Sequence, residues 1–349
     1  MMNLIVVPNF KTGGSERILK MYVDYCKLNS INYDLVFISS YGNNNFWKGY
    51  KYKIISDTNY LGYFFLPFFL FNKKYNISFT SNIYLNSILS ILRKCKIFDV
   101  NKILIRESTN YYKRFKGFQL LKYSFFHKIG YKYSDTVIFQ TNEMKSYFDK
   151  NLQLLNPLKI VLPNPIEKDK IKSMSELQTD IIDKEYFICL GRLIYDKGFD
   201  ILINAYSKCE SLPDLYIFGS GIEYNNLKKL ITNNKLSNKI FIKDEIINPF
   251  PLIKSAKGCI LPSRNEGFPN VLNEMILLNK NILSTKCVED ISKMSWILTC
   301  EPNDENSMIT MLKKLNSNFQ LTTIQETKRS NYIKNLSYSS YFDKFKTIQ

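Results

Sequence analysis

Three stretches in the second half of this 349-residue chain carry residues whose types and spacing suit phosphate and sugar chemistry. The first follows the apolar run 186–190 and reads G-R-x4-K-G, with Gly191, Arg192 and Lys197. A guanidinium offers a planar fork of donors and an ammonium a mobile point charge, a combination that suits a diphosphate. Because α/β sheets bind ligands at the carboxyl ends of their strands, this loop is a candidate anion site. Two ordinary surface cations on a strand-to-helix loop are the alternative.

The second stretch is F-G-S-G, in which Gly219 and Gly221 end an apolar run and precede the amphipathic segment 222–234. Glycine lets backbone approach a ligand closely. The full dinucleotide fingerprint G-x-G-x-x-G is absent, because position 224 is tyrosine. A plain tight turn therefore stays open as the alternative.

The third stretch, 262–274, should leave a strand and enter a helix near Pro269, since proline is favoured in a first helical turn. Free backbone N–H groups at 270–272 would then bind an anion, helped by a helix dipole of about half a charge. Glu266 in the loop and Glu274 in the helix bracket this site and can accept sugar hydroxyls. Glutamates eight residues apart prove little alone, so the whole loop carries the prediction.

The elements that must position these stretches alternate between strand and helix along the whole chain. Apolar runs separated by amphipathic segments predict parallel sheets in two α/β domains. We expect an N-terminal domain over 1–165, a second over 166–334, and a helix from about 335 that is able to pack back on the first. The boundary is placed at L-P-N-P followed by a polar connection to about 184. The expected strands are 4–7, 33–38, 77–80, 102–105, 136–139, 186–190, 214–218, 239–242, 258–261 and 281–283.

The net charge of +17 is distributed unevenly. Residues 1–165 hold 23 Lys and Arg against 9 Asp and Glu, whereas the remainder holds 25 against 22. The positive charge of the N-terminal half therefore predicts an anionic partner: a nucleic acid, a membrane surface or a phosphorylated acceptor.

The stretch 60–71 is the most apolar in the chain and is followed by Lys73 and Lys74. It is shorter than the roughly 20 residues that span a bilayer. It predicts either a buried helix under the N-terminal sheet or a helix lying on a membrane surface with its aromatic side chains in the interface.

The seven cysteines are odd in number, widely spread and without a CxxC pair, so neither a disulfide framework nor a zinc site is expected. The first residues lack a basic segment and read as a buried strand rather than a signal peptide. These features lead us to expect a cytoplasmic protein, peripheral on the inner face of the plasma membrane.

The three stretches, in this order and spacing, resemble glycosyltransferase family 4, whose members are retaining enzymes of the GT-B fold. Gly13-Gly14-Ser15-Glu16-Arg17 is similar to the family's G-G-x-E-R loop, and Leu162-Pro163-Asn164-Pro165 to its I-P-N-G/P linker. The resemblance covers nearly the whole chain and is densest over 186–280. It implies two Rossmann-like domains with a deep cleft between them.

The resemblance also implies roles for individual residues. Arg192 and Lys197 would hold the donor diphosphate, Glu274 the ribose hydroxyls, and Glu266 the transferred sugar, which makes Arg192, Lys197 and Glu266 the catalytic set. The remaining donor contacts would be Gly13, Gly14, Gly191, Gly219, Gly221, Gly267, Phe268, Pro269, Asn270, Val271 and Leu272. Candidates for the acceptor side are Ser15, Arg106, Glu107 and Asn164. No metal and no cofactor is expected, and the chain has no D-x-D motif.

Two departures from the family pattern stand out. Many relatives place a histidine at the end of an N-terminal strand, where this chain has Arg106 and Glu107, which equally suit a structural ion pair. The single histidine, His127, falls in the middle of a predicted helix. Lys243-Asp244-Glu245 stands where relatives commonly have a glycine, which affects the nucleobase side.

The leading prediction is a retaining, metal-independent transferase that moves a sugar from a nucleotide diphosphate donor, expected to be a UDP-sugar. Its acceptor would be a lipid-linked saccharide in cell-surface polysaccharide assembly, at an anionic membrane surface. Alternatives are a donor-binding but inactive partner subunit, another GT-B activity such as an epimerase or phosphorylase, and a nucleic-acid-binding protein suggested by charge alone, which we do not favour. The sequence does not fix the oligomeric state.

Overall fold

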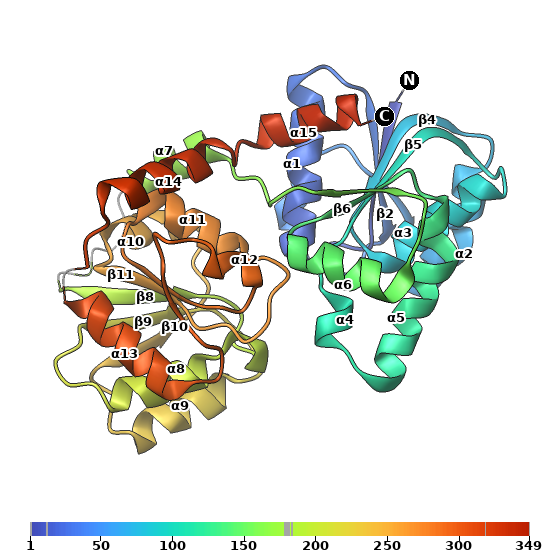
Figure 1. Ribbon diagram of the computed structural model, residues 1–349. Helices are drawn as coiled ribbons and strands as arrows, with labels where there is room; N and C mark the ends of the chain where they lie inside the picture. Colours follow the sequence, from blue (N-terminus) through green and yellow to red (C-terminus); the bar gives the residue numbers. More distant parts are fainter. Residues whose placement is uncertain (1, 12, 178–181, 183, 318, 349) are drawn as a thin grey trace. The chain divides into compact units, whose positions relative to one another are not determined.

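The computed structural model describes residues 2–11, 13–177, 182, 184–317 and 319–348. The chain divides into two compact units, and each is described here by itself (Figure 1). The first unit is Met1–Pro165 with Tyr338–Gln349, and the second is Ile166–Ser337. Both are α/β, as the alternating pattern predicts.

The first unit is built on a seven-stranded parallel sheet in the order β3-β2-β1-β4-β5-β6-β7. All five strands expected in this half are present. The sequence did not reveal β3 and β7, which are short and lie at the two edges of the sheet. Edge strands are less buried, so their apolar pattern is weaker. The strands are β1 (Met2–Val7), β2 (Tyr33–Ser39), β3 (Lys53–Ser56), β4 (Lys74–Thr80), β5 (Asp99–Arg106), β6 (Thr136–Phe139) and β7 (Leu158–Val161).

Helices cover both faces of this sheet (Figure 1). In β1, Ile5 and Val7 pack with one face and Leu4 and Val6 with the other, because successive strand side chains point in opposite directions. The Ile5 face is covered by α1 (Gly14–Leu28) and α15 (Tyr338–Thr347). The Leu4 face is covered by α2 (Asn59–Leu70), α3 (Ile83–Lys94) and α6 (Asn142–Leu152). The helix α5 (Gly117–Gly130) packs on α3, where a Cβ at Gly130 would come within 2.3 Å of Ser87 Cα.

The second unit is built on a six-stranded parallel sheet in the order β10-β9-β8-β11-β12-β13. All five expected strands are present, and only the three-residue β13 was missed. The strands are β8 (Tyr186–Leu190), β9 (Asp214–Phe218), β10 (Ile240–Lys243), β11 (Gly258–Leu261), β12 (Ile282–Thr285) and β13 (Leu298–Cys300).

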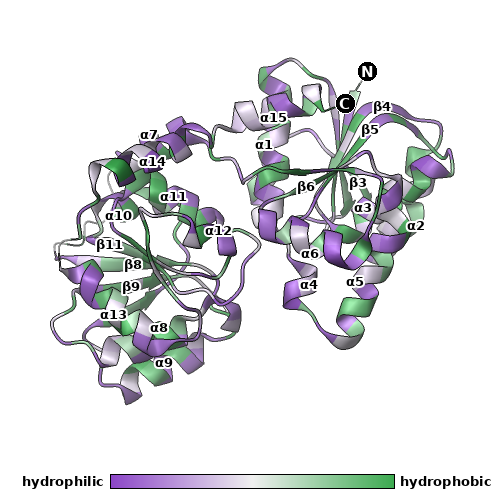
Figure 2. Cartoon of the chain, in the orientation of Figure 1, coloured by the Kyte–Doolittle hydropathy of each residue, from purple (hydrophilic) through white to green (hydrophobic). Residues whose placement is uncertain are grey.

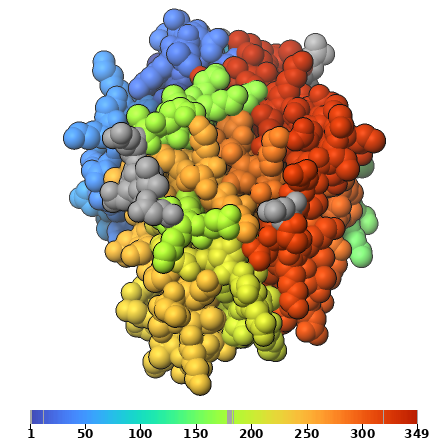
Figure 3. Space-filling model, turned by 90° about the vertical axis from the view of Figure 1, so that its left-hand side faces the viewer, coloured from blue at the N-terminus to red at the C-terminus, as the bar shows by residue number. Residues whose placement is uncertain are grey.

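Two apolar clusters flank this second sheet. One is formed with α8 (Phe199–Ser207), α9 (Tyr224–Asn233) and α13 (Glu305–Asn316). The other is formed with α7 (Lys168–Ser175), α10 (Phe250–Ser255), α11 (Asn270–Leu278) and α12 (Glu289–Ser292). The helix α14 (Thr323–Lys334) lies beside α11, where Tyr332 Oη donates to Asn273 Oδ1 at 2.9 Å. In Figure 3 the red surface of α13 and α14 forms one side of this unit.

The polar connection expected after Pro165 contains a helix, α7. Its Ile171 is buried in the second unit, and Asn248 Nδ2 donates to the Met174 carbonyl at 2.9 Å. One buried apolar side chain in eight residues gives almost no periodic signal, so tertiary contacts rather than sequence pattern specify this helix. Residues 178–181 and 183 of the expected connection lie outside the described residues.

The apolar stretch 60–71 forms α2, and the expectation of a buried helix is wrong. Only Gly62, Leu66 and Leu70 are buried, and they form one narrow stripe. A Cβ at Gly62 would lie 2.1 Å from the carbonyl oxygen of Ile38, so the helix backbone rests directly on β2. The aromatic side chains around this stripe are exposed, although α2 is largely hydrophobic in composition (Figure 2). Over the described residues, no helix is both long and apolar enough to cross a membrane.

Candidate sugar-nucleotide site

The three predicted stretches follow β8, β9 and β11, which lie side by side in the second sheet. Because the strands are parallel, the loops that follow them emerge at one edge. The sheet order therefore brings together segments that are up to about 80 residues apart in sequence.

The loop after β8 is held against the loop after β9 by backbone hydrogen bonds. Leu193 N donates to the Ser220 carbonyl at 2.8 Å, and Gly191 N donates to the Phe218 carbonyl at 3.1 Å. A Cβ at Gly219 would lie 1.9 Å from the Gly191 carbonyl oxygen, and one at Gly221 would lie 2.3 Å from that of Leu193. The F-G-S-G glycines are thus needed for contact between two loops, whatever else approaches them.

The ammonium of Lys197 meets the carboxylate of Glu266 across the loops after β8 and β11. Lys197 Nζ donates to Glu266 Oε1, and the same oxygen accepts from Ser263 Oγ at 2.9 Å. The two side chains are 16% and 15% exposed, so the pair is sheltered but accessible. The structure joins two of the three predicted catalytic residues and adds Ser263, which sequence reasoning missed.

The third, Arg192, has an exposed side chain, while its backbone is part of the same loop. Its carbonyl accepts from Ile194 N at 2.9 Å, and its amide nitrogen lies 3.8 Å from the position of a Cβ at Gly219. The guanidinium of Arg192 therefore projects into solvent from the same loop that carries Lys197.

Arg264 fixes the loop after β11 to the loop after β8. Its role was not predicted from the sequence. Its guanidinium donates to both carboxylate oxygens of Asp200 at 2.7 Å and to the Tyr195 carbonyl at 2.6 Å. Burial lowers the pKa of Arg264, but the hydrogen bonds and charge of Asp200 outweigh it and raise the pKa overall. Gly198, at φ 65°, completes the contact, because a Cβ there would lie 2.1 Å from the Pro262 carbonyl oxygen.

The helix predicted to begin near Pro269 is α11, with Pro269 as its N-cap. Pro269 forms no side-chain cap, and within the first turn Leu272 N donates to the Pro269 carbonyl at 3.0 Å. Gly267, Asn270 and Val271 are partly exposed, as the expected backbone contacts require. Phe268, Leu272 and Glu274 are buried, so the first two offer only backbone, and the Glu274 carboxylate sits in a sheltered position.

The predicted residues of the first unit lie at the start of α1. Gly13 is the N-cap and Gly14 the first residue of the helix, as expected. Ser15 Oγ donates to Glu16 Oε2 at 2.9 Å, and a Cβ at Gly13 would lie 2.9 Å from the same oxygen.

Arg106, Glu107 and Asn164 form a buried network rather than an open acceptor surface. Arg106 donates to Asn164 Oδ1 at 2.5 Å and to Ser81 Oγ at 3.0 Å, and Glu107 accepts from Tyr131 Oη. All three predicted residues are less than 4% exposed. Burial lowers the pKa of Arg106, whereas the interactions with Tyr341 and Glu107 raise it by a smaller amount. These side chains can position the end of β5 and the start of the linker.

His127 lies within α5, as predicted, and is also buried in this network. Its Nε2 is 3.6 Å from Glu107 Oε2, and its Nδ1 is 3.2 Å from Tyr112 Oη. Its place between aromatic rings fits a structural role.

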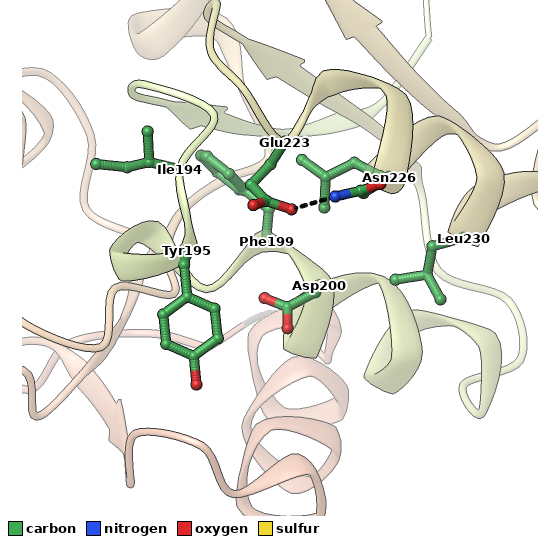
Figure 4. Close-up of a pocket in the computed structure, with 8 residues that line it drawn as sticks. Ile194, Tyr195, Phe199, Asp200, Glu223, Asn226 and Leu230 are labelled. Carbon is green, nitrogen blue, oxygen red and sulfur yellow. Dashed lines mark hydrogen bonds between the residues drawn. The ribbon is translucent and has the colours of Figure 1, made fainter.

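A cavity of about 240 Å³, not expected from the sequence, lies beside the loop after β8 (Figure 4). The donor residues predicted above are not among its described lining residues, although Tyr195 belongs to the same loop. Glu223 accepts from Asn226 at 2.9 Å at its rim. The cavity is lined by Ile194, Tyr195, Phe199, Asp200, Glu223, Asn226, Leu227 and Leu230.

No group of three His, Cys, Asp or Glu side chains within the described ranges is placed to hold a metal ion. The seven cysteines are free thiols.

The architecture is that of the GT-B glycosyltransferases. HepE of Anabaena, solved in complex with UDP, superposes with a TM-score of 0.79 at 14% identity, covering 99% of both chains. Sucrose-phosphate synthase from Thermosynechococcus elongatus superposes with a TM-score of 0.78 at 12% identity, covering 99% of this chain and 98% of that one.

Residues 184–318 match the family model of the group 1 glycosyl transferases. This range contains the Lys197–Glu266 pair and α11. An uncharacterised glycosyltransferase of Methanocaldococcus jannaschii is 32% identical over 180 residues, 48% of this chain and 43% of that protein. The N-acetylgalactosamine-N,N'-diacetylbacillosaminyl-diphospho-undecaprenol 4-alpha-N-acetylgalactosaminyltransferase of Campylobacter jejuni is 26% identical over 159 residues, 44% of this chain and 43% of that protein. The matches thus span less than half the length of these relatives.

Proposed function

We propose that this chain is a retaining glycosyltransferase that takes a sugar from a nucleoside diphosphate, with UDP as the carrier. The observation that carries the proposal is the meeting of Lys197, Glu266 and Ser263 beside the uncapped entrance of α11. A mobile cation, a hydroxyl-accepting carboxylate and the positive end of a helix dipole are groups that suit a sugar diphosphate. They lie together on a segment that matches the group 1 glycosyl transferases.

The proposed chemistry depends on charge at the leaving group. Cleavage of the anomeric bond builds negative charge on the diphosphate and positive charge on the sugar, so catalysis needs cations and dipoles already in place. Lys197, Arg192 and the amide groups of α11 would supply them at the diphosphate, and Glu266 would face the sugar. We assign no protein nucleophile. The leaving phosphate would act as the base for attack from its own face, and no metal is required.

The donor and acceptor are inferred from relatives. HepE binds UDP in its crystal structure, which supports UDP as the carrier. The Campylobacter relative acts on a diphospho-undecaprenol saccharide, which supports a lipid-linked acceptor in cell-surface polysaccharide assembly. Such an acceptor would bring the enzyme to a membrane surface. The positive first unit would be drawn there, at about 1 kcal/mol for each cation near an anionic leaflet.

The donor is best identified by thermal shift with UDP-, GDP-, ADP- and CMP-sugars. A ligand that binds only the folded state raises the melting temperature with the logarithm of its concentration. We expect UDP-sugars to raise it in the presence of EDTA and the other carriers to have smaller effects. Donor hydrolysis by the purified chain would then distinguish an enzyme from an inactive partner subunit. An inverted product anomer would contradict retention.

Variants at the two cations test the site directly. Lys197→Ala should weaken UDP binding about tenfold to a hundredfold, the value of a charge-assisted hydrogen bond, as measured by titration calorimetry. Lys229→Ala, at an exposed position in the same unit, is the matched control and should bind normally. Arg192→Ala should lower turnover; normal turnover would refute its leaving-group role.

A further inference from the structure

The first unit exposes two aromatic stripes, one on α2 and one on α5. On α2, Tyr60, Phe64 and Phe68 are spaced four residues apart and point away from the buried Gly62, Leu66 and Leu70. Tyr60 is 90% and Phe68 70% exposed. The rings of Phe64 and Phe68 lie 6.1 Å apart, so they form one continuous surface. Leu61, Phe65 and Phe71 extend it.

The second stripe lies on α5. Phe118, Leu121 and Phe125 recur at intervals of three and four residues on one side of this helix, and Phe118 is 83% exposed. Contacts through α3 connect the two helices: Lys122 Nζ lies 5.3 Å from the centre of the Tyr84 ring and interacts electrostatically with Tyr60. We call the exposed residues of both stripes the α2–α5 surface. Figure 1 shows α2, α3 and α5 on the same side of the first unit.

The segments that form the α2–α5 surface carry cations only, of which Arg93 and Lys113 pair with Asp135 and Glu143 outside these segments. The segments 58–98 and 108–134, which include α2, α3 and α5, contain no Asp or Glu. They contain the cations Lys73, Lys74, Arg93, Lys94, Lys96, Lys113, Arg114, Lys116, Lys122, Lys128 and Lys132. By contrast, α2 itself carries no charge. An apolar face bordered by cations fits an anionic surface with an apolar interior.

We propose that the α2–α5 surface docks the chain on an anionic lipid bilayer, with the aromatic side chains in the interface and the lysines at the headgroups. Aromatic and leucine side chains gain from burial at the boundary between headgroups and acyl chains, and lysines from attraction to anionic headgroups. A second copy of the chain fits less well, because the same cations would repel each other across the interface. The inference rests on the membrane part of the proposed function and adds the surface responsible.

Tryptophan reporters test which residues enter the bilayer. Both native tryptophans, Trp47 and Trp296, are buried, so a new exposed one can be distinguished from them. Phe64→Trp and Phe118→Trp should show a blue-shifted emission with phosphatidylglycerol-containing vesicles, and quenching when the acyl chains are brominated. Ile247→Trp, at a still more exposed position of the second unit, should show neither.

Sedimentation of the full chain with vesicles gives the affinity. Phe64→Ser with Phe68→Ser, or Phe118→Ser with Phe125→Ser, should each reduce binding about tenfold or more. Lys122→Glu should reduce binding at least about fivefold, and added salt should shrink its effect. Leu155→Ser and Ile222→Ser remove exposed apolar side chains elsewhere and should bind as the unaltered chain does. Melting curves confirm that every variant folds.

Three results would overturn the proposal: no binding of the unaltered chain to anionic vesicles, equal binding by the α2–α5 variants and their controls, or binding to a single-stranded oligonucleotide without binding to vesicles. A dimer that dissociates in the α2–α5 variants would assign the surface to self-association instead. UDP binding, measured on the same samples, stays intact if only this inference fails.

Discussion

Lys197 can keep its partner and still bind an anion. An ammonium has three donors, and the structure uses one of them for Glu266 Oε1. The carboxylate also accepts from Ser263, so its position is set from two sides. The pair therefore holds Lys197 in place near the amides of α11 without removing it from contact with solvent.

The glycines of the loop after β9 act through this same arrangement. We predict that Gly219→Ala weakens UDP binding about tenfold and lowers the melting temperature. Its Cβ would lie 1.9 Å from the Gly191 carbonyl oxygen, so the loop that carries Arg192 and Lys197 must move. Titration calorimetry and thermal melting measure the two effects.

The matched control is Gly49→Ala, which has φ 83° and nothing within 4 Å of the new Cβ. It shares the backbone strain, worth about 1–2 kcal/mol, but not the clash. Unchanged UDP affinity in Gly219→Ala would show that the contact between the loops does not hold the donor site.

At the scale of elements, the C-terminal helix α15 belongs to the core of the first unit. Phe342 and Phe345 are fully buried and pack with tilted rings against Tyr22 of α1 at centroid distances of 5.1 and 5.3 Å. Tyr25 Oη donates to Asp343 at 2.6 Å on the outer side. The first unit is therefore assembled from both ends of the chain (Figure 1).

We predict that Phe342→Ala lowers the free energy of unfolding of the first unit by about 3–5 kcal/mol, because it empties a core position. Lys344→Ala, exposed on the same helix, should change it by less than about 0.5 kcal/mol. Urea denaturation followed by circular dichroism measures both. Equal effects of the two variants would show that α15 is only loosely attached.

At the scale of the whole molecule, burial of thiols and phenols links stability to alkaline pH. Burial raises the pKa of Cys26 from 9.0 to about 11 and that of Cys300 from 9.0 to about 12. Burial also raises the pKa of Tyr112 from 10.0 to about 12. The folded state thus keeps protons that the unfolded chain releases.

Stability should therefore be unaffected by these groups below about pH 9 and fall as the pH rises toward 11. Each such group contributes a slope of about 1.4 kcal/mol per pH unit within its window. The urea midpoint across this range measures the effect. Cys26→Ala should reduce the slope by the contribution of one titrating group between about pH 9 and 11. A urea midpoint independent of pH would contradict the prediction.

The sequence by itself determined the fold class, the ten main strands and the helix entrance at Pro269. These features depend on local signals: apolar runs of strand length, glycine and proline punctuation, and the residues of a few loops. The same local signals identified Lys197 and Glu266 individually. They did not identify Arg264, because a loop arginine that binds Asp200 and Tyr195 looks like any surface cation until the chain is folded.

Only the tertiary structure decided which side chains are buried and which remain outside. Arg106 and Glu107 looked available for an acceptor and are enclosed, whereas the aromatic residues of α2 looked like core and are exposed. Burial depends on what packs against an element, and those partners come from distant parts of the chain. The close approach of α2 to β2 at Gly62 shows the physical reason. Only the narrow stripe of Gly62, Leu66 and Leu70 packs on the sheet, and the other apolar residues of α2 remain exposed.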